Sequence, residues 1–433
     1  MPATVPRVTP WRCVSLKVSK GQAMNPSPID YASPRQATGR REGLVLMLGS
    51  SLTIMGAVMV APILPKLGAE FGPQEPHADL LVPLAITGPA LAIALCAPLA
   101  GWLADRLGRK ALLVIATFLY AVLGALPALL DNLQAIVGVR LLFGCTEAAV
   151  MTCCATLIAD YWYGEDRLRY INRQVVTIGL VGSLFFVVGG ALGEHSWRLP
   201  FLLYLMPLLL VPLMMKVLWE PATSRPTVEA PEQGRVAVLP LVLGYLLILG
   251  GMVLSFIVPI QTPILLVSLG VTSSTMIGLS AGLGLLATLG GSLAWPVLRR
   301  RLGIAGCNAL LLVLLGFGLW LLIRSQTYNA VLLAVLIHGL GAGILVPNTM
   351  APVMNALSAR TRGRGLGGFT ACLYFGQFFS PLVVAVLSTW AGDLRHSILW
   401  LALASFASAL VWALAGLQAR HKAATRAFGS SHS

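Results

Sequence analysis

Two ionisable residues, Arg140 and Glu147, lie within a long apolar stretch of about Gln134 to Ala159. A charged side chain at the centre of a membrane helix costs roughly 2.5–3.5 kcal/mol, so such residues are functional by default. The spacing of seven residues places both on one helix face, ~10.5 Å apart along the axis. This separation prevents a direct salt bridge but permits a shared, water-filled path. The pattern predicts that Glu147 exchanges protons and that Arg140 tunes this exchange.

A structural role is the alternative for both residues. Loss of solvent penalises an ionised carboxylate, whereas a nearby guanidinium stabilises it, so the balance between the two decides whether protonation changes near neutral pH. Glu147 can instead hydrogen-bond a neighbouring helix for packing. Arg140 lies only six residues from Gln134 and can likewise be structural.

A second group of polar residues is the run G-W-L-A-D-R-L-G-R-K from Gly101 to Lys110. Apolar stretches flank it on both sides, and each is long enough to cross ~30 Å of hydrocarbon. We therefore expect a turn between two membrane helices, in which Gly108 is free to adopt positive φ. Arg106 and Arg109 indicate a cytoplasmic loop, and an acid among these cations, Asp105, indicates a fixed partner.

The composition sets the class of protein. Of 433 residues, 57% are apolar and 11% are charged, and the mean hydropathy is +0.82, as in a polytopic membrane protein. The net charge of +14 does not indicate nucleic-acid binding, because the basic residues lie in loops. Seven cysteines without C-x-x-C spacing are expected to be small core residues, and six scattered histidines lack metal-ligand spacing. These features disfavour an enzyme, and without a nucleotide-binding loop the energy source should be an ion gradient.

Apolar stretches predict twelve membrane helices within residues 43–417, as six plus six. Residues 1–42 are expected to be a disordered cytoplasmic tail that starts at Met1 or Met24, and 418–433 a second tail. Residues 220–235 form a polar linker between two bundles, 43–219 and 236–417. Pro62 and Pro65 predict a kink in the first helix. The expected helices span about 43–67, 80–103, 111–130, 134–159, 175–192, 199–219, 236–260, 275–298, 305–322, 330–357, 366–390 and 398–417.

The distribution of basic residues tests this arrangement. Of the 30 Lys and Arg residues, 25 fall in segments that twelve spans place in the cytoplasm. Four fall on the opposite side (Lys66, Arg198, Arg324 and Arg395), and Arg140 lies within the membrane. A miscounted helix would have scrambled this alternation, so we expect a multi-pass protein of the inner or plasma membrane with both termini in the cytoplasm.

The run from Gly101 to Lys110 resembles, at every fixed position, the motif G-x-L-A-D-R-x-G-R-K between helices 2 and 3 of the major facilitator superfamily. R-L-L-F-G-C-T-E-A, from Arg140 to Ala148, is similar to the helix 4 pattern of that superfamily. G-Q-F-F-S-P-L, from Gly376 to Leu382, looks like helix 11 of bacterial efflux permeases. The resemblance implies an all-α membrane fold of twelve helices in two pseudo-symmetric six-helix bundles, with a substrate cavity between them.

Two segments depart from the family patterns. F-F-V-V-G-G, from Phe185 to Gly190, keeps half of the G-P-x-x-G-G signature that many drug:proton antiporters carry. G-G-S-L-A-W-P-V-L-R-R-R-L-G, from Gly290 to Gly303, mirrors the first loop motif, but Trp295 stands where the spacing requires aspartate.

For the function, proton-coupled efflux of a drug-like compound or metabolite is the first expectation. Proton-coupled uptake of a small organic solute is the alternative.

The resemblance also implies a cytoplasmic gate. In this gate Asp160 engages Arg109, and Asp105 meets the start of helix 11, where Gly365 to Gly368 and Arg362 or Arg364 are available. A solvated loop needed only for topology is the alternative. The gate residues are Gly101, Asp105, Arg106, Gly108, Arg109 and Asp160.

Polar and aromatic residues of the apolar stretches are candidates for the cavity wall, although packing explains aromatic residues and a buried histidine as well. The candidates are Tyr120, Phe185, Phe186, His338, Asn348, Tyr374 and Gln377. The expected partners are a small-molecule substrate, a coupling ion, which is expected to be a proton, and the lipid bilayer. We expect no cofactor, metal or nucleic acid, and a chain that works as a monomer.

Overall fold

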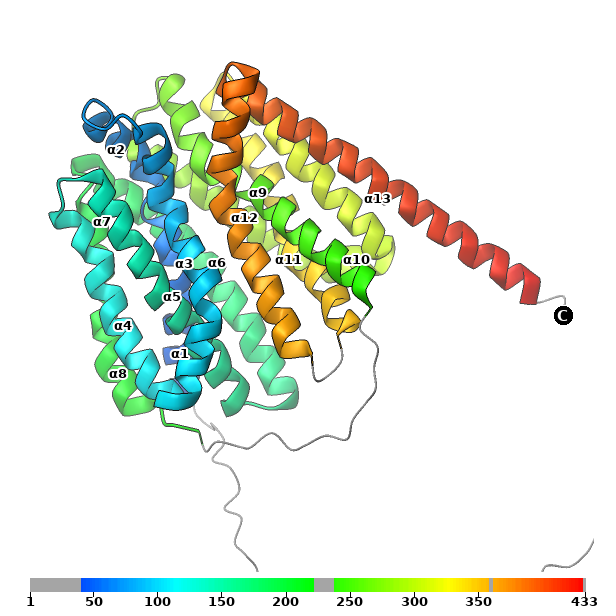
Figure 1. Ribbon diagram of the computed structural model, residues 1–433, viewed down its shortest axis with the longest axis horizontal. Helices are drawn as coiled ribbons and strands as arrows, with labels where there is room; N and C mark the ends of the chain where they lie inside the picture. The colour runs from blue at the N-terminus through cyan, green and yellow to red at the C-terminus, as the bar shows by residue number, and fades with distance from the viewer. Residues whose placement is uncertain (1–39, 222–236, 358–360, 431–433) are drawn as a thin grey trace, which may run out of the picture. The chain divides into compact units, whose positions relative to one another are not determined.

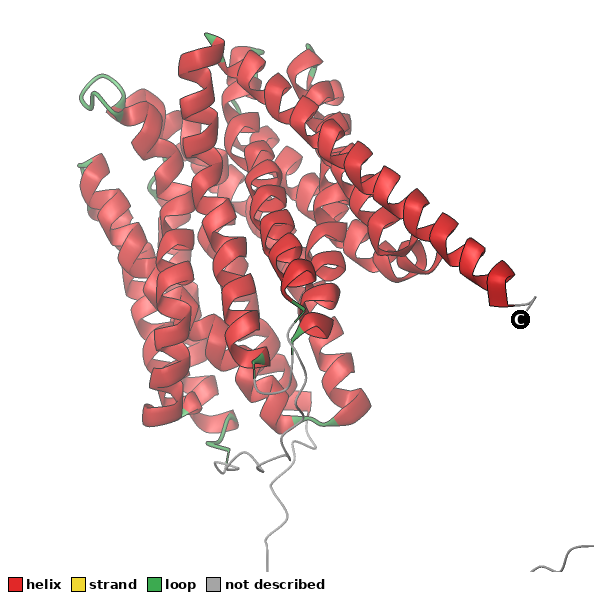
Figure 2. Ribbon diagram, turned by 45° about the vertical axis from the view of Figure 1, so that its right-hand side comes forward, coloured by secondary structure: helices red, strands yellow, loops and turns green. Residues whose placement is uncertain are grey.

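The computed structural model describes residues 40–221, 237–357 and 361–430. In these ranges the chain is helical and has no β-strand, as Figure 2 shows. Eleven described helices are long and apolar enough to cross a membrane. The longest, α10 (Ser274–Arg324), consists of two arms that meet at Gly303, whose φ of 73° and ψ of −173° are not helical. Counting these arms separately gives the twelve predicted spans in the described part of the chain.

The first half of the chain contains six spans (Figure 1). The first span breaks at residues 59–63, which confirms the kink predicted from Pro62 and Pro65. The sixth span is interrupted where Pro207 lies within a 3₁₀ segment, because proline cannot donate to the helical ladder. The elements are α1 (Arg40–Val58), η1 (Ala61–Ile63), α2 (Leu64–Phe71), α3 (Ala78–Leu107), α4 (Arg109–Ala125), η2 (Leu126–Leu129), α5 (Leu133–Tyr161), α6 (Gly164–His195), α7 (Leu199–Leu202), η3 (Leu203–Leu209) and α8 (Leu210–Val217).

The second half contains the remaining spans. They are α9 (Val238–Ser268), the two arms of α10, α11 (Tyr328–Ala356), α12 (Arg362–Ala391) and α13 (Leu394–Ser430). Hydropathy places the end of α9 near Ile260, but the helix continues to Ser268. Two other helices extend into polar segments: α6 begins at Gly164 rather than near Val175, and α13 continues past Leu417. Hydropathy marks only the apolar part of a helix, and both extensions are rich in polar residues. Most of the predicted linker and of the N-terminal tail, residues 222–236 and 1–39, lies outside the described residues.

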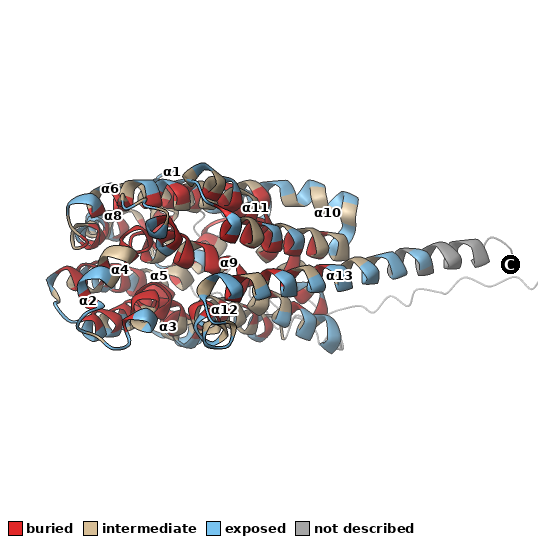
Figure 3. Ribbon diagram, turned by 90° about the horizontal axis from the view of Figure 1, so that it is seen from above, coloured by how far each residue is buried: buried red, intermediate tan, exposed pale blue. Residues whose placement is uncertain are grey.

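The buried apolar side chains form two separate clusters. One consists of residues between Val45 and Leu218, and the other of residues between Ile248 and Ala409. Buried positions face the interior of each bundle, whereas exposed positions lie mainly on the outer surface (Figure 3). The halves meet chiefly where α6 packs against α10 and α3 packs against α12. Each half therefore has its own core, and the space between the cores is where a cavity can form.

Candidate functional site

Arg140, on α5, is fully buried in the first half. Its Nε donates to the carbonyl of Ala85 at 2.9 Å, and its Nη2 donates to the carbonyl of Gly56. Nη1 lies 3.4 Å from the hydroxyl of Tyr204, and the guanidinium lies over the ring of Phe143, 4.7 Å from its centroid. Arg140 therefore joins α5 to α1, α3 and η3 through partners that carry no charge.

Glu147 lies two helical turns further along α5, and its residue is 4% exposed. The carboxylate fills the space beside Gly56, since a methyl group on that glycine would stand 2.7 Å from Oε2. No hydrogen bond or ion pair engages the carboxylate within the described residues, although it interacts electrostatically with Arg140 and with Tyr374 of α12. The Tyr374 hydroxyl lies 3.0 Å from the Sδ atom of Met151, one turn beyond Glu147. An unpartnered carboxyl group thus lies near the contact between the two halves.

A cavity of about 200 Å³ lies between the halves. Helices α9, α10 and α11 form most of its wall, and Ala57, Ile86 and Phe186 complete it from the first half. Phe186 and His338 are the predicted cavity residues that line it, and Nε2 of His338 lies 3.2 Å from the carbonyl oxygen of Leu254. Among the described residues the wall is otherwise apolar apart from hydroxyl groups, and none of them brings a carboxylate, ammonium or guanidinium group to it.

The other predicted cavity residues lie away from this wall. The Tyr120 hydroxyl donates to the carbonyl of Leu52 at 2.5 Å and is fully buried in the first-half core. Phe185 packs against that core, and Gln377 is half-buried on α12. Tyr374 belongs to the surroundings of Glu147. A role of these residues in substrate binding stays a prediction.

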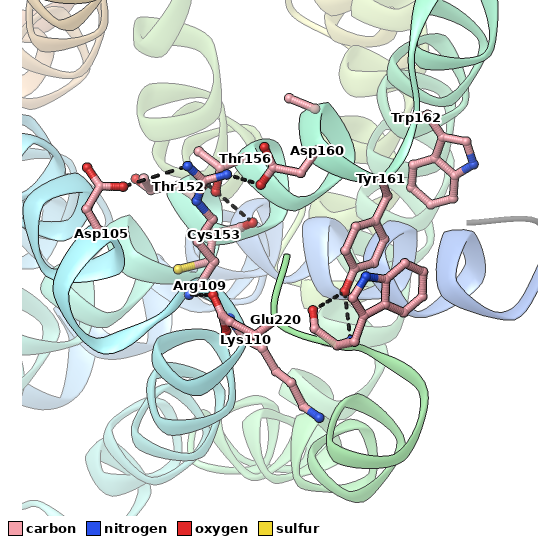
Figure 4. Close-up of polar contacts among 12 residues, drawn as sticks. Asp105, Arg109, Lys110, Thr152, Cys153, Thr156, Asp160, Tyr161, Trp162 and Glu220 are labelled. Carbon is pink, nitrogen blue, oxygen red and sulfur yellow. Dashed lines mark hydrogen bonds and ion pairs between the residues drawn. The ribbon is translucent and has the colours of Figure 1, made fainter. Parts of the chain in front are cut away.

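The run from Gly101 to Lys110 lies at one end of the bundles, which we term the Gly108 end. Arg109 forms an ion pair with Asp160, as the sequence predicts, and Nη2 of Arg109 lies 3.7 Å from the carboxylate of Asp105 (Figure 4). The carboxylate of Glu220 accepts from the backbone N–H groups of Arg109 at 2.6 Å and Lys110 at 2.9 Å. Glu220 thereby caps the N-terminus of α4, and every member of this network belongs to the first half.

Gly108 makes the turn at the start of this network possible. Its φ of 91° is one that L residues rarely adopt, and a methyl group on it would stand 2.9 Å from the Glu220 carboxylate. Arg106 instead lies over the ring of Trp102, 4.2 Å from its centroid, and Gly101 faces open space. The structure therefore brings together four of the six predicted gate residues.

The start of α12 does not join this network in the described part of the chain. Asp105 is paired only with Arg109 there, and its side chain is 73% exposed. The carbonyl of Gly365 accepts from the Tyr245 hydroxyl at 2.7 Å, so this glycine-rich turn packs on α9. The side chain of Arg362 lies outside the described residues. Asp105 thus makes no ion pair or hydrogen bond with the described side chains of α12, and the expected contact stays a prediction.

Residues 46–320 match the Major Facilitator Superfamily, and this range is more than half of the chain. The chain belongs to this superfamily. Its members and structural neighbours are transporters, so the protein is a multi-pass membrane transporter and not an enzyme.

Two curated relatives of this superfamily member show the range of its similarities. It is 33% identical to a tetracycline resistance protein, class C, of Escherichia coli. This similarity extends over 167 residues, which make up 37% of this chain and 40% of that protein. It is 30% identical over 198 residues to the gallate transporter of Pseudomonas putida, 45% of this chain and 42% of that protein. The matches thus span less than half the length of these relatives. The inward-open xylose transporter XylE from E. coli has the same fold, with a TM-score of 0.70 at 17% identity over 86% of this chain and 94% of that one.

The end of this transporter opposite Gly108, which we term the Glu194 end, holds the halves together. Glu194, on α6, accepts from the Ser273 hydroxyl and from the backbone N–H of Thr275 at 2.9 Å, at the N-terminus of α10. The glycine pair of F-F-V-V-G-G allows this close approach, because a methyl group on Gly190 would collide with the backbone of Ser274. The halves are therefore in contact at the Glu194 end, whereas the network at the Gly108 end stays within one half.

In the second half, Asn348 is the centre of the network that corresponds to the one at the Gly108 end, and its described members include no carboxylate. Its Oδ1 accepts from Trp295 Nε1 at 3.1 Å and from Arg299 Nη1 at 3.2 Å. Its Nδ2 donates to Asn308 Oδ1 at 2.6 Å and to the carbonyl of Ile304 at 3.2 Å. Asn348 is fully buried and satisfied, so it holds the second loop motif in place rather than lining the cavity.

Sequence reasoning missed most of the cavity wall, including the hydroxyl residues Ser255 and Thr262 of α9. Hydroxyl residues are common in membrane helices, so composition alone does not mark them. The signal that could have found them is the pair Pro259 and Pro263, because two prolines four residues apart free backbone carbonyls at one place in a helix.

Proposed function

We propose that this transporter moves a small organic molecule, a drug-like compound or metabolite, out of the cell in exchange for protons. The observation that carries the proposal is the carboxyl group of Glu147, which is buried in mid-helix without a hydrogen bond among the described residues. An ionisable group inside a membrane is costly and is kept for ion movement in most cases. Such a group can take up and release a proton as the cavity opens to each side in turn.

The position of Glu147 supports coupling to the cavity. Its carboxylate lies against Gly56, and the next residue of α1, Ala57, lines the cavity. Arg140 donates to the carbonyl of the same Gly56, so both charged residues act on one short segment of α1. A change in the charge of Glu147 would therefore alter the position of the α1 segment that lines the cavity, while Arg140 keeps its positive charge.

The networks at the two ends support alternating access. We propose that Gly101, Asp105, Arg106, Gly108, Arg109 and Asp160 form a cytoplasmic gate, and that Glu194 with Ser273 and Thr275 closes the opposite side. In this conformation the outer contact is made and the inner residues are paired within their own half. The count of basic residues supports cytoplasmic termini and an inner or plasma membrane location.

The direction of transport is tested by accumulation of a labelled substrate in whole cells, with and without an uncoupler. Efflux predicts that the uncoupler raises the cellular level of substrate, because the proton gradient no longer drives export. The resistance protein among the relatives favours efflux, and the gallate transporter keeps uptake as the second candidate. A fall in cellular substrate on addition of the uncoupler would establish uptake instead.

A further inference from the structure

Two residues that line the cavity between the halves carry hydroxyl groups that bond to nothing in the described residues. Among those residues, three side-chain polar atoms that are themselves completely enclosed lack a hydrogen-bond partner, and two of them are Ser255 Oγ and Thr262 Oγ1. Both residues line the cavity, and they are 8% and 3% exposed. The third such atom belongs to Glu42, at the start of α1. A buried hydroxyl without a partner costs free energy, so two at one cavity indicate a ligand that supplies the missing bonds.

Other hydroxyl groups of the same wall behave differently. Ser280 Oγ donates to the carbonyl of Ile277 at 2.7 Å, and Thr288 Oγ1 donates to the carbonyl of Gly284 at 2.9 Å. Both bond back to their own helix, as serine and threonine commonly do in membrane helices. Ser255 and Thr262 are therefore exceptional for this wall.

The backbone of α9 adds acceptors at the same place. Pro259 cannot donate to the carbonyl of Ser255, and Pro263 cannot donate to that of Pro259, because proline has no N–H group. Ser255, Pro259 and Pro263 all line the cavity. The hydroxyl groups without a partner and the carbonyls that prolines cannot serve thus lie on the same helix of the wall, α9.

The cavity also limits the size and charge of its ligand. A cavity of roughly 150 Å³ holds benzene, so about 200 Å³ accommodates a compact molecule of one or two rings. No carboxylate, ammonium or guanidinium group lines the wall, and burying an unpaired charge is very costly. Ser255 and Thr262 are seven residues apart, ~10.5 Å along the helix axis, which matches the length of a two-ring molecule better than that of a single ring.

We propose that Ser255 and Thr262 are the hydrogen-bonding contacts for an uncharged, mainly apolar substrate of one or two rings with a hydroxyl-type group at each end. This inference rests on the proposed transport through the cavity, and it assigns recognition to α9 of the second half rather than to the charged residues of the first. Ser255 takes one end of the molecule and Thr262 the other, while Phe186 and Phe256 contact its ring faces or edges.

The test uses the full chain in lipid nanodiscs and three probes: the para,para′-biphenyldiol, the apolar parent biphenyl, and the biphenyl that carries one para-hydroxyl and one para′-carboxylate. The affinity of each probe is measured for the wild type, Ser255→Ala and Thr262→Val, and for the controls Ser268→Ala and Thr349→Val, whose hydroxyl groups bond back to their own helices away from the cavity. Thr262→Ser restores a hydroxyl and should recover binding. Thermal unfolding without a probe verifies that every variant is folded.

We expect each test variant to bind the diol roughly three- to tenfold more weakly, which corresponds to one lost hydrogen bond. Binding of biphenyl should not change, and both controls should stay within about twofold of the wild type, since they lose no ligand contact. Equal losses in test and control variants would overturn the proposal. So would a diol that binds no better than biphenyl, or a carboxylate probe that binds best.

Proton-driven flux of the diol into or out of proteoliposomes separates this inference from the proposed function. If the binding pattern holds but no proton gradient drives flux, the coupling proposal fails and the recognition site stands. If a gradient drives flux and the test variants transport like the controls, coupling stands and the recognition site is refuted.

Discussion

The two halves of this transporter share a fold but differ in the kind of polar group that each buries. The first half buries a guanidinium and a carboxylate, Arg140 and Glu147, and carries ion pairs at its Gly108 end. The second half buries neutral groups, among them His338 and the Asn348 network, and contributes most of the cavity wall. The difference underlies the division of labour that we propose, in which the first half responds to protons and the second half recognises the substrate.

The largest expected effect comes from Glu147→Gln, which keeps the volume but removes the titrating group. Proton-driven transport should fall to the level of the uncoupled leak, while energy-independent exchange of substrate across the membrane persists. Flux in proteoliposomes with and without a pH gradient measures both. Glu42→Gln, at the start of α1, is the control and should transport like the wild type. Accumulation against a gradient at the wild-type rate in Glu147→Gln would move the proton site elsewhere, with His338 as the next candidate.

The second prediction compares Arg140 and Asn348, the buried residues at the centre of one hydrogen-bond network in each half. Arg140→Met leaves the carbonyl of Ala85 without its side-chain donor and the carbonyl of Gly56 with the Tyr204 hydroxyl alone, so the free energy of unfolding should fall by about 3 kcal/mol. Asn348→Leu should cost about 1–3 kcal/mol, because it strands Asn308. Only Arg140→Met should also change the pH dependence of transport, since only Arg140 places a charge near Glu147. An equal change in both variants would contradict the division between the halves.

Sequence patterns predicted those parts of the molecule that depend on local order. Hydropathy and the distribution of basic residues yield twelve spans, and two prolines mark the break after α1. The pairing of Arg109 with Asp160 followed from a motif whose geometry is shared across a family. Each of these features is encoded within one helix or one turn, or is repeated in related chains.

Contacts between distant segments could not be predicted in this way. Glu220 caps α4 across more than a hundred residues, and nothing near either segment indicates the other. Likewise, Ser280 bonds back to its own helix whereas Ser255 and Thr262 have no partner among the described residues, and their residue types do not distinguish these cases. The same holds for Tyr120, whose hydroxyl has a backbone partner in α1 and not a cavity.

The third prediction uses the glycines of the two loop motifs. Gly303 has a φ of 73° and no neighbour near an added methyl group, so Gly303→Ala should cost about 1–3 kcal/mol of unfolding free energy through backbone strain alone. Gly108→Ala has similar strain and also brings the methyl group to 2.9 Å from the Glu220 carboxylate. It should therefore cost about 1 kcal/mol more. Adding Glu220→Ala to each variant forms a double-mutant cycle, and coupling should appear with Gly108 only.

The smallest expected effect on stability, and the sharpest test of the gate, comes from Asp105→Asn. Asp105 is 73% exposed and 3.7 Å from Arg109, and a surface pair of this kind contributes about 0–1 kcal/mol. A residue needed only for the loop would therefore leave both stability and transport nearly unchanged. If Asp105 closes the cytoplasmic side in another conformation, its loss should favour the inward-open state and slow turnover without weakening substrate binding.

The comparison variant is Asp160→Asn. It breaks the closer ion pair of Arg109, so it should lower stability more than Asp105→Asn does. Turnover in reconstituted vesicles, measured beside substrate affinity, separates the two roles, and wild-type turnover in Asp105→Asn would leave the loop with a topological role only.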